Sequence, residues 1–210
     1  MDYLTVPPMF SGRTVAVLAS GPSMSWAMAD AVRHLPRIVV NSTFRLATDA
    51  DIIYAADEAW WRLNANAIAC PGLKVMVEIL PGRPQPVPEG IHVMRNTGRR
   101  GFDPNPSSLR TFANSGAQAI QVAVHAGAAR ILLLGFDMHG GHWHDEHPWP
   151  LMQAEPAAHA RRIVAFRDLA MALSARGISV INCTPGSRLD CFPRESLEST
   201  LAIADLGVAA

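Results

Sequence analysis

Short runs of apolar residues recur along the chain, separated by segments in which apolar residues repeat every three or four positions. The short runs are rich in Val, Ile and Leu, which is typical of strands buried on both faces. Their alternation with helices predicts an α/β fold with a Rossmann-like, mostly parallel sheet and helices on both faces. The predicted strands are residues 14–20, 38–40, 51–56, 74–79, 131–135 and 178–182, with a weaker candidate at 90–94.

Two helix-period segments carry apolar residues on one side of a predicted helix. These residues are Met24, Met28, Ala31 and Leu35 in the first segment and Ile163, Phe166, Ala170 and Leu173 in the second. Such stripes are typical of a hydrophobic core rather than a cofactor site. Gly127 and Gly177 stand where a helix should end before the next strand, which is the usual place for a C-terminal glycine.

Two segments interrupt the alternation. Residues 81–113 are rich in Pro, Gly and Arg, and residues 136–156 follow a predicted buried strand. Since α/β proteins keep their binding sites in loops at the carboxyl ends of strands, we interpret both segments as long loops near such a site. With 210 residues and 49% apolar content, the chain is predicted to form one domain over residues 1–210.

Net charge limits the partners that the chain can bind, and cysteine content indicates its compartment. The 18 basic and 18 acidic residues give a formal net charge of +0, so the chain lacks the broad positive field of nonspecific nucleic-acid binding. The 3 cysteines are widely spaced and form no CxxC pair, which favours a reducing compartment. The start of the chain has no basic and apolar leader, and no run reaches the roughly 18 apolar residues of a membrane span. We therefore expect a cytoplasmic protein that binds neither membranes nor nucleic acid.

Gly21, Pro22 and Ser23 separate the first predicted strand from a helix. A helix N-terminus presents unpaired N–H groups and partial positive charge, so a phosphate is one candidate ligand at this break. The alternative is a tight turn, with Pro22 in the first helical turn and Ser20 or Ser23 as the cap. The motif is neither GxGxxG nor a P-loop, and both interpretations stay open.

Polar residues also end the second and third predicted strands. Asn41 carries an amide that can pair with a nucleobase edge, or it forms a turn. Asp57 can hold Mg²⁺ or a ribose hydroxyl, or it caps a helix that carries Trp60 and Trp61. Both residues are expected at the carboxyl edge of the sheet.

Residues 114–139 form the most informative unit. Asn114, Ser115 and Gly116 open a helix whose first turn carries no acidic residue, and the following strand ends at Asp137. We expect the N-terminus of this helix to point at the same edge of the sheet as the N-terminus of the helix that follows Ser23. Two such termini facing one cleft would suit the phosphates of a nucleotide.

Four histidines lie within nine residues directly after Asp137. They are His139, His142, His144 and His147, interleaved with Asp145 and Glu146. This density can bind a transition metal, supply a general acid or base near neutral pH, or form a solvated polar loop. His144 and His147 are the predicted acid or base, because Trp143 and Pro148 beside them would stiffen the loop.

Four segments carry a resemblance to known families: VLASGPSM at 17–24, VVNSTF at 39–44, NSGAQAIQVAVHAGAARILLLGFDM at 114–138 and ARGISVINCTPGSRL at 175–189. In this order they resemble the 6-hydroxymethylpterin diphosphokinase-like family, common among phage and prophage proteins. More distantly, they are similar to the bacterial sialyltransferases of glycosyltransferase family forty-two. The resemblance covers about residues 12–200. It implies a nucleotide site lined by Gly21, Pro22, Ser23, Asn114, Ser115 and Gly116, with Asn41 near the base or ribose.

The diphosphokinase resemblance implies transfer of diphosphate from ATP to a small hydroxymethyl acceptor, with Mg²⁺ as cofactor. Asp57 and Asp137 would then anchor Mg²⁺, and Arg99 and Arg100 would close over the phosphates. The expected partners are a nucleotide and a small hydroxyl-bearing acceptor. A phage-encoded member would work in the cytoplasm of the host cell, and the sequence leaves a homo-oligomer open.

Two alternatives follow from the same resemblance. The sialyltransferases transfer a sugar from a CMP-sugar, with tyrosines on the departing phosphate and a later histidine as the base. Here the loop after Asp137 has histidines in place of those tyrosines, and His159 lies near the position of the base. The third possibility is a noncatalytic, phage-encoded nucleotide-binding or assembly module that kept the fold and lost the chemistry.

Overall fold

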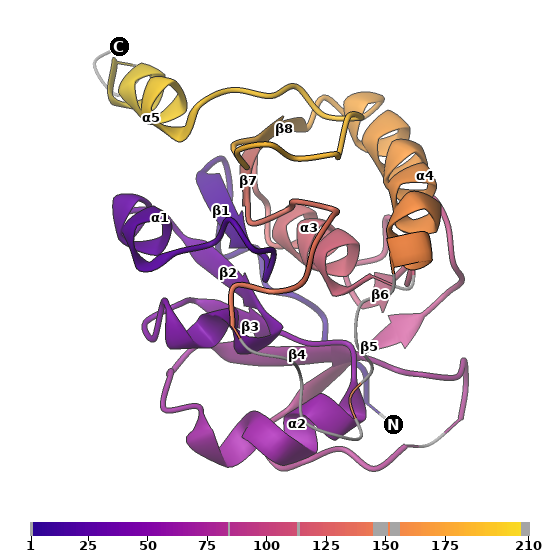
Figure 1. Cartoon of the computed structure of the whole chain (residues 1–210). Coiled ribbons are helices and arrows are strands. Elements are labelled where there is room, and N and C mark those ends of the chain that lie inside the picture. The colour runs from indigo at the N-terminus through magenta and orange to yellow at the C-terminus, as the bar shows by residue number, and fades with distance from the viewer. Residues whose placement is uncertain (1, 84, 113, 145–150, 152–155, 207–210) are drawn as a thin grey trace.

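The computed structural model describes residues 2–83, 85–112, 114–144, 151 and 156–206. Within these residues, 8 strands form one parallel sheet in the order β6-β5-β4-β3-β2-β1-β7-β8 (Figure 1). The strands are β1 (Thr14–Leu18), β2 (Arg37–Val40), β3 (Ile52–Tyr54), β4 (Leu73–Val77), β5 (His92–Asn96), β6 (Ser108–Leu109), β7 (Arg130–Leu134) and β8 (Ser179–Asn182). The α/β, Rossmann-like class predicted from the sequence is confirmed.

The interval 81–113 differs from the loop that the sequence predicted, because it contains β5 and β6. The weaker strand candidate at 90–94 corresponds to β5, displaced by two residues at each end. No strand was predicted at β6, because two residues are too few to give an alternating pattern.

The helices are α1 (Trp26–Ala31), α2 (Glu58–Asn64), α3 (Ser115–His125), α4 (Pro156–Ser174) and α5 (Leu197–Leu206), with 3-10 turns η1 (Asn41–Arg45) and η2 (Ala65–Ala67). Ser25 caps α1, since its hydroxyl accepts from the Met28 N–H at 3.3 Å, and so the predicted caps Ser20 and Ser23 are wrong. Gly127 and Gly177 follow α3 and α4 with φ of 92° and 71°. A left-handed glycine at these points ends each helix, as predicted.

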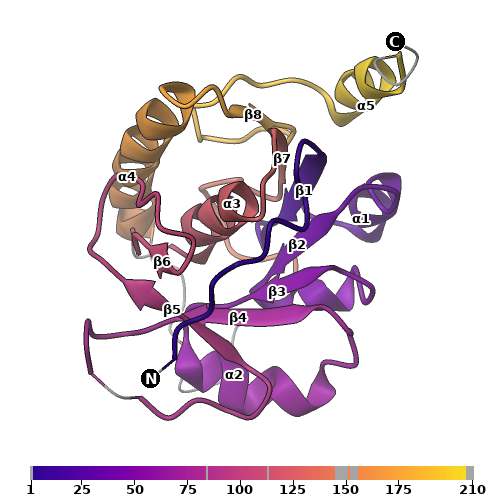
Figure 2. The ribbon, with the colours of Figure 1, turned by 180° about the vertical axis from the view of Figure 1, so that it is seen from behind.

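Helices cover both faces of the sheet (Figures 1 and 2). Val15 and Val17 of β1 belong to a core cluster that includes buried residues of α3 and α4. Ala16 and Leu18 alternate with them and belong to a second cluster, which includes residues of α1, α2 and α5. Because successive side chains of a strand point to opposite faces, a strand buried on both sides must be apolar throughout. That is why β1 reads as a continuous apolar run.

The chain changes direction across the sheet at β1. This strand pairs with β2 on one side and with β7 on the other. The chain moves outward from β1 to β6, and α3 then returns it to β7 (Figure 2). Loops that leave neighbouring strands in opposite directions open a crevice at their carboxyl ends, where ligands of α/β proteins bind. Among the described residues, no helix combines the length and apolar character that crossing a membrane requires.

Candidate functional site

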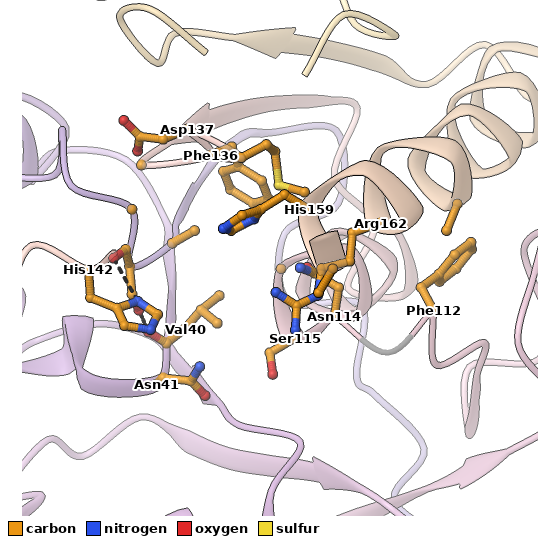
Figure 3. Close-up of a pocket in the computed structure, with 18 of the residues that line it drawn as sticks. Val40, Asn41, Phe112, Asn114, Ser115, Phe136, Asp137, His142, His159 and Arg162 are labelled. Atoms are coloured by element: carbon orange, nitrogen blue, oxygen red, sulfur yellow. Dashed lines mark hydrogen bonds between the residues drawn. The ribbon is translucent and has the colours of Figure 1, made fainter. Parts of the chain in front are cut away.

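A pocket of about 890 Å³ opens at the carboxyl ends of the strands. Its walls come from the segments that follow β1, β2, β3, β5, β6 and β7, from the start of α3 and from the N-terminal half of α4. Figure 3 shows lining residues from the end of β2, the start of α3, the segment after β7 and α4 around one space. We call it the carboxyl-edge pocket. Of the sequence-predicted site residues, it brings together Gly21, Asn41, Asp57, Arg99, Arg100, Asn114, Ser115, Gly116, Asp137 and His159.

Pro22 and Ser23 do not line this pocket within the described part of the chain. Ser23 turns instead to Asp137, which accepts the Ser23 backbone N–H at 3.2 Å and the Ser23 hydroxyl at 2.9 Å. The Gly21 N–H donates to the Gly135 carbonyl at 2.9 Å. These bonds join the loops after β1 and β7, so the Gly-Pro-Ser segment is a structural junction, and only Gly21 of it reaches the pocket.

Asp137 serves this junction from inside the protein. It is 2% exposed. Burial raises the pKa of its carboxyl above the ordinary value, and the two bonds from Ser23 act in the opposite direction. Asp137 also lines the pocket, so it remains within reach of a ligand there.

Asn41 and Asp57 reach the pocket from β2 and β3. Asn41 holds a left-handed backbone, with φ of 50°, at the point where β2 passes into η1. Asp57 caps α2 by accepting from the Ala59 N–H at 2.8 Å, which confirms the capping interpretation. The described residues contain no group of three His, Cys, Asp or Glu side chains arranged to hold a metal ion.

The start of α3 presents backbone donors to the pocket. Asn114 is the N-cap and accepts from the Ala117 N–H at 3.0 Å, and the first turn carries no acidic residue. Gly116 is small for a packing reason, because a Cβ atom there would lie 2.8 Å from the ring of Phe136. The predicted pair of helix termini is reduced to this one within the described residues, since no residue of α1 lines the pocket.

Arg162 is a pocket residue that the sequence interpretation missed. It reaches in from α4 and is half-buried (Figure 3). Burial lowers the pKa of its guanidinium, and the neighbouring Arg161 lowers it further. No carboxylate lies within ion-pair distance of Arg162 among the described residues. The signal available in the sequence was its position three residues after His159, on the same helical face.

His159 lies beside Arg162 on the pocket side of α4 (Figure 3). Both ring nitrogens are buried, and neither has a hydrogen-bond partner among the described residues. Burial is the main cause that lowers the pKa of His159. The nearby Gly140 backbone raises it, and Arg162, His139 and His142 lower it further. These surroundings favour the neutral imidazole, the form that can accept a proton.

The histidine segment is fixed to the strand ends through Ser20. The Ser20 carbonyl accepts from the Trp143 N–H at 3.2 Å and lies 3.2 Å from Nδ1 of His142. Trp143 Nε1 donates to the Thr43 hydroxyl at 3.2 Å. His139 and His142 line the pocket, and His144 stacks on His142 with ring centroids 5.1 Å apart.

Of the two histidines predicted as the acid or base, only His144 lies within the described residues. His144 is not among the pocket-lining residues of the described chain. His147 lies outside the described residues, as do Asp145 and Glu146.

Arg99 and Arg100 both line the pocket on the side of β5. The Arg100 guanidinium pairs with Asp168 of α4, which ties this loop to the helix that carries Arg162. Arg99 has no ion pair within the described residues. One arginine of the pair is thus held in place and the other remains available to an anion.

Comparison of the chain with models of known protein families gives no match, and comparison with curated proteins gives none either. The chemistry of the pocket therefore carries the functional argument. It combines backbone donors, a half-buried arginine and a neutral imidazole at the edge of a parallel sheet where α/β proteins bind ligands.

Proposed function

We propose that this chain is a nucleotide-dependent transferase. The phosphates of the nucleotide bind between the first turn of α3 and Arg162, and His159 accepts the proton of a hydroxyl acceptor. The observation that carries the proposal is Arg162, which is half-buried in the pocket and has no carboxylate in ion-pair distance among the described residues. A buried cation normally has an anionic partner, so an anionic ligand is the natural complement of this site.

The preferred reaction is transfer of diphosphate from ATP to a small hydroxymethyl acceptor. His159 takes the hydroxyl proton while the hydroxyl oxygen forms a bond to the β-phosphorus. The bond between that phosphorus and the α–β bridging oxygen breaks, and AMP leaves with the electron pair. Arg162 and the α3 N–H groups stabilise the charge that develops on the phosphate oxygens.

Magnesium fits this reaction at Asp57 and Asp137. Mg²⁺ needs only one or two protein carboxylates when phosphates supply further oxygens, and both side chains line the pocket. Each carboxylate has lone pairs beyond those used by the Ala59 and Ser23 donors. When bound, the ion would neutralise phosphate charge.

Glycosyl transfer from a CMP-sugar is the second candidate. Asp57 caps α2, and Asp137 holds the loops after β1 and β7 together. These structural roles account for both carboxylates without a bound Mg²⁺, which favours this reaction. In this reaction the acceptor oxygen bonds to the anomeric carbon, and CMP leaves with the electrons of the carbon–oxygen bond. His159 takes the hydroxyl proton in the same way.

Calorimetric titration with ATP and with CMP, each with and without Mg²⁺, tests the proposal. Arg162→Met should weaken binding at least about tenfold, because a charge-assisted contact to phosphate is worth about 1.5–3 kcal/mol. Arg167→Met is the matched control, since Arg167 lies on the same helix and pairs with Asp190 at 2.8 Å outside the pocket.

The outcomes separate the candidate functions. Tighter binding of ATP, dependent on Mg²⁺, supports diphosphate transfer, and tighter binding of CMP without Mg²⁺ supports glycosyl transfer. Nucleotide binding without turnover of any hydroxyl acceptor favours the noncatalytic binding module. Equal nucleotide affinities of the Arg162→Met and Arg167→Met variants would contradict the proposed site.

A further inference from the structure

A chain of hydrogen bonds crosses the core from β3 to the start of α3. The Tyr54 hydroxyl donates to Oε1 of Gln118 at 2.5 Å, and Nε2 of Gln118 donates to the Thr111 carbonyl. Tyr54 is 0% exposed and Gln118 is 2% exposed, so water cannot replace these bonds. A buried phenol and a buried amide are costly unless each is satisfied, and here each satisfies the other.

The Thr111 carbonyl lies just before the start of α3 and bonds to its N-cap residue. It accepts the Asn114 N–H at 3.2 Å, and Asn114 in turn caps the helix. Phe112 follows Thr111 with φ of 50°, a left-handed conformation that is costly for a bulky residue. The bonds at the Thr111 carbonyl hold this strained backbone in place.

The segment that leads into α3 is also held through bonds of Arg110 and Phe112. Gln121 is fully buried and both accepts from the Arg110 N–H at 3.0 Å and donates to the Arg110 carbonyl at 2.8 Å. The Phe112 N–H donates to the Arg99 carbonyl at 3.2 Å. Arg99 and Phe112 both line the carboxyl-edge pocket, where Figure 3 shows Phe112 on the side of Asn114 and Ser115. The buried amides of α3 therefore shape a wall of the pocket.

We infer that Tyr54 and Gln118 are positioning residues that hold the α3 terminus in the geometry that binds nucleotide phosphates. This inference rests on the proposed function, because it assigns the phosphates to that terminus. Backbone donors stabilise an oxyanion only within about 2.7–3.1 Å of it, so a small displacement of the terminus weakens every such contact at once. Neither side chain lines the pocket itself in the described chain, so both act through the backbone of Thr111.

The test compares the two tyrosines of the chain. Tyr54→Phe removes the hydroxyl that donates to Gln118. Tyr3→Phe is the matched control, because the Tyr3 hydroxyl donates to Glu78 at 2.7 Å and Tyr3 does not line the pocket. Two quantities are measured: the dissociation constant for ATP or CMP, whichever the parent binds more tightly, and amide hydrogen exchange at residues 114–117 without nucleotide.

Tyr54→Phe should speed exchange at these amides and raise the dissociation constant at least about fivefold, the effect of losing one ordinary hydrogen bond. Tyr3→Phe should leave both quantities at the parent values. Faster exchange with an unchanged dissociation constant would overturn the positioning role, and so would unchanged exchange. A parent that binds no nucleotide would refute the proposed function, and exchange alone would then decide whether the pair orders the terminus.

A second variant covers the case in which Tyr54→Phe does not fold. Combining Tyr54→Phe with Gln118→Met removes both polar groups and leaves no orphaned Oε1 in the core. The contact with Thr111 is still lost, so the same changes in exchange and affinity are expected. Parent-like values in this double variant would also overturn the inference.

Discussion

A Cβ atom on Gly21 would lie 1.9 Å from Oδ2 of Asp137 and 2.5 Å from the Gly135 carbonyl oxygen. The loops after β1 and β7 thus approach too closely for any side chain at this position. The glycine of the Gly-Pro-Ser motif is required by this junction, whatever ligand the pocket takes. A bulkier residue at Gly21 would consequently change the fold of the junction together with any binding.

The first prediction concerns this glycine. Gly21→Ala should lower the free energy of unfolding by about 1–3 kcal/mol, because one loop must move to relieve the overlap. Gly141→Ala is the control, since a Cβ atom there meets nothing within 4 Å, and it should change stability by less than about 0.5 kcal/mol. Urea unfolding measures both variants, and equal midpoints would contradict the close approach at Gly21.

The second prediction concerns the pH dependence of stability at Asp137. Burial raises the pKa of this carboxyl above the ordinary 3.8, so the folded state binds a proton more tightly than the unfolded state does. The stability that proton binding to Asp137 contributes is complete below the pKa of the unfolded state and is lost as the pH rises through the pKa of the folded state. Asp137→Asn should remove this fall in stability with rising pH, because the amide cannot ionise. The urea midpoints of the parent and the variant, measured from below pH 3.8 upward, test this difference. Midpoints that change with pH in the same way in both proteins would refute the prediction.

The third prediction separates the two roles of Asp57. Asp57→Asn keeps a good N-cap and removes the charge, so the free energy of unfolding should change by only a few tenths of a kcal/mol. Asp57→Ala loses the cap as well and should cost about 1 kcal/mol. Both variants should weaken the Mg²⁺ dependence of nucleotide binding if Asp57 anchors the ion. Titrations with Mg²⁺ that match the parent would leave Asp57 with capping alone.

The fourth prediction assigns the proton acceptor. His159→Ala should reduce turnover by about a hundredfold or more and leave nucleotide affinity nearly unchanged. Because burial lowers the pKa of His159 below 6.5, the parent rate should be constant at neutral pH and should fall only on acidification below that value. His34→Ala is the control, as His34 is exposed, precedes β2 and does not line the pocket. Parent-like turnover of His159→Ala would exclude this residue as the base.

Much of the fold could be predicted from the sequence, since the signals are local. Apolar runs gave the strands that are buried on both faces, and the glycines at 127 and 177 marked helix ends. The cap at Asp57, one of the two interpretations of this residue, involves an N–H group only two residues away. Interactions over such short separations are encoded in the order of residue types, so a pattern along the chain can predict them, although it placed the α1 cap at Ser20 or Ser23 instead of Ser25.

The tertiary structure decided which of the polar residues meet. Ser23 and Asp137 are 114 positions apart, and their contact makes the segment, for which the sequence left a phosphate site and a tight turn open, a junction between the loops after β1 and β7. Arg162 enters the pocket because α4 packs against the sheet through Phe166, and the Gly116 position is small because Phe136 lies against it. These relationships depend on the strand order and on the loops that share one edge of the sheet. The sequence alone determined most of the elements and the cap at Asp57. The folding of distant segments onto one another decided the site, because no local periodicity records which loops become neighbours.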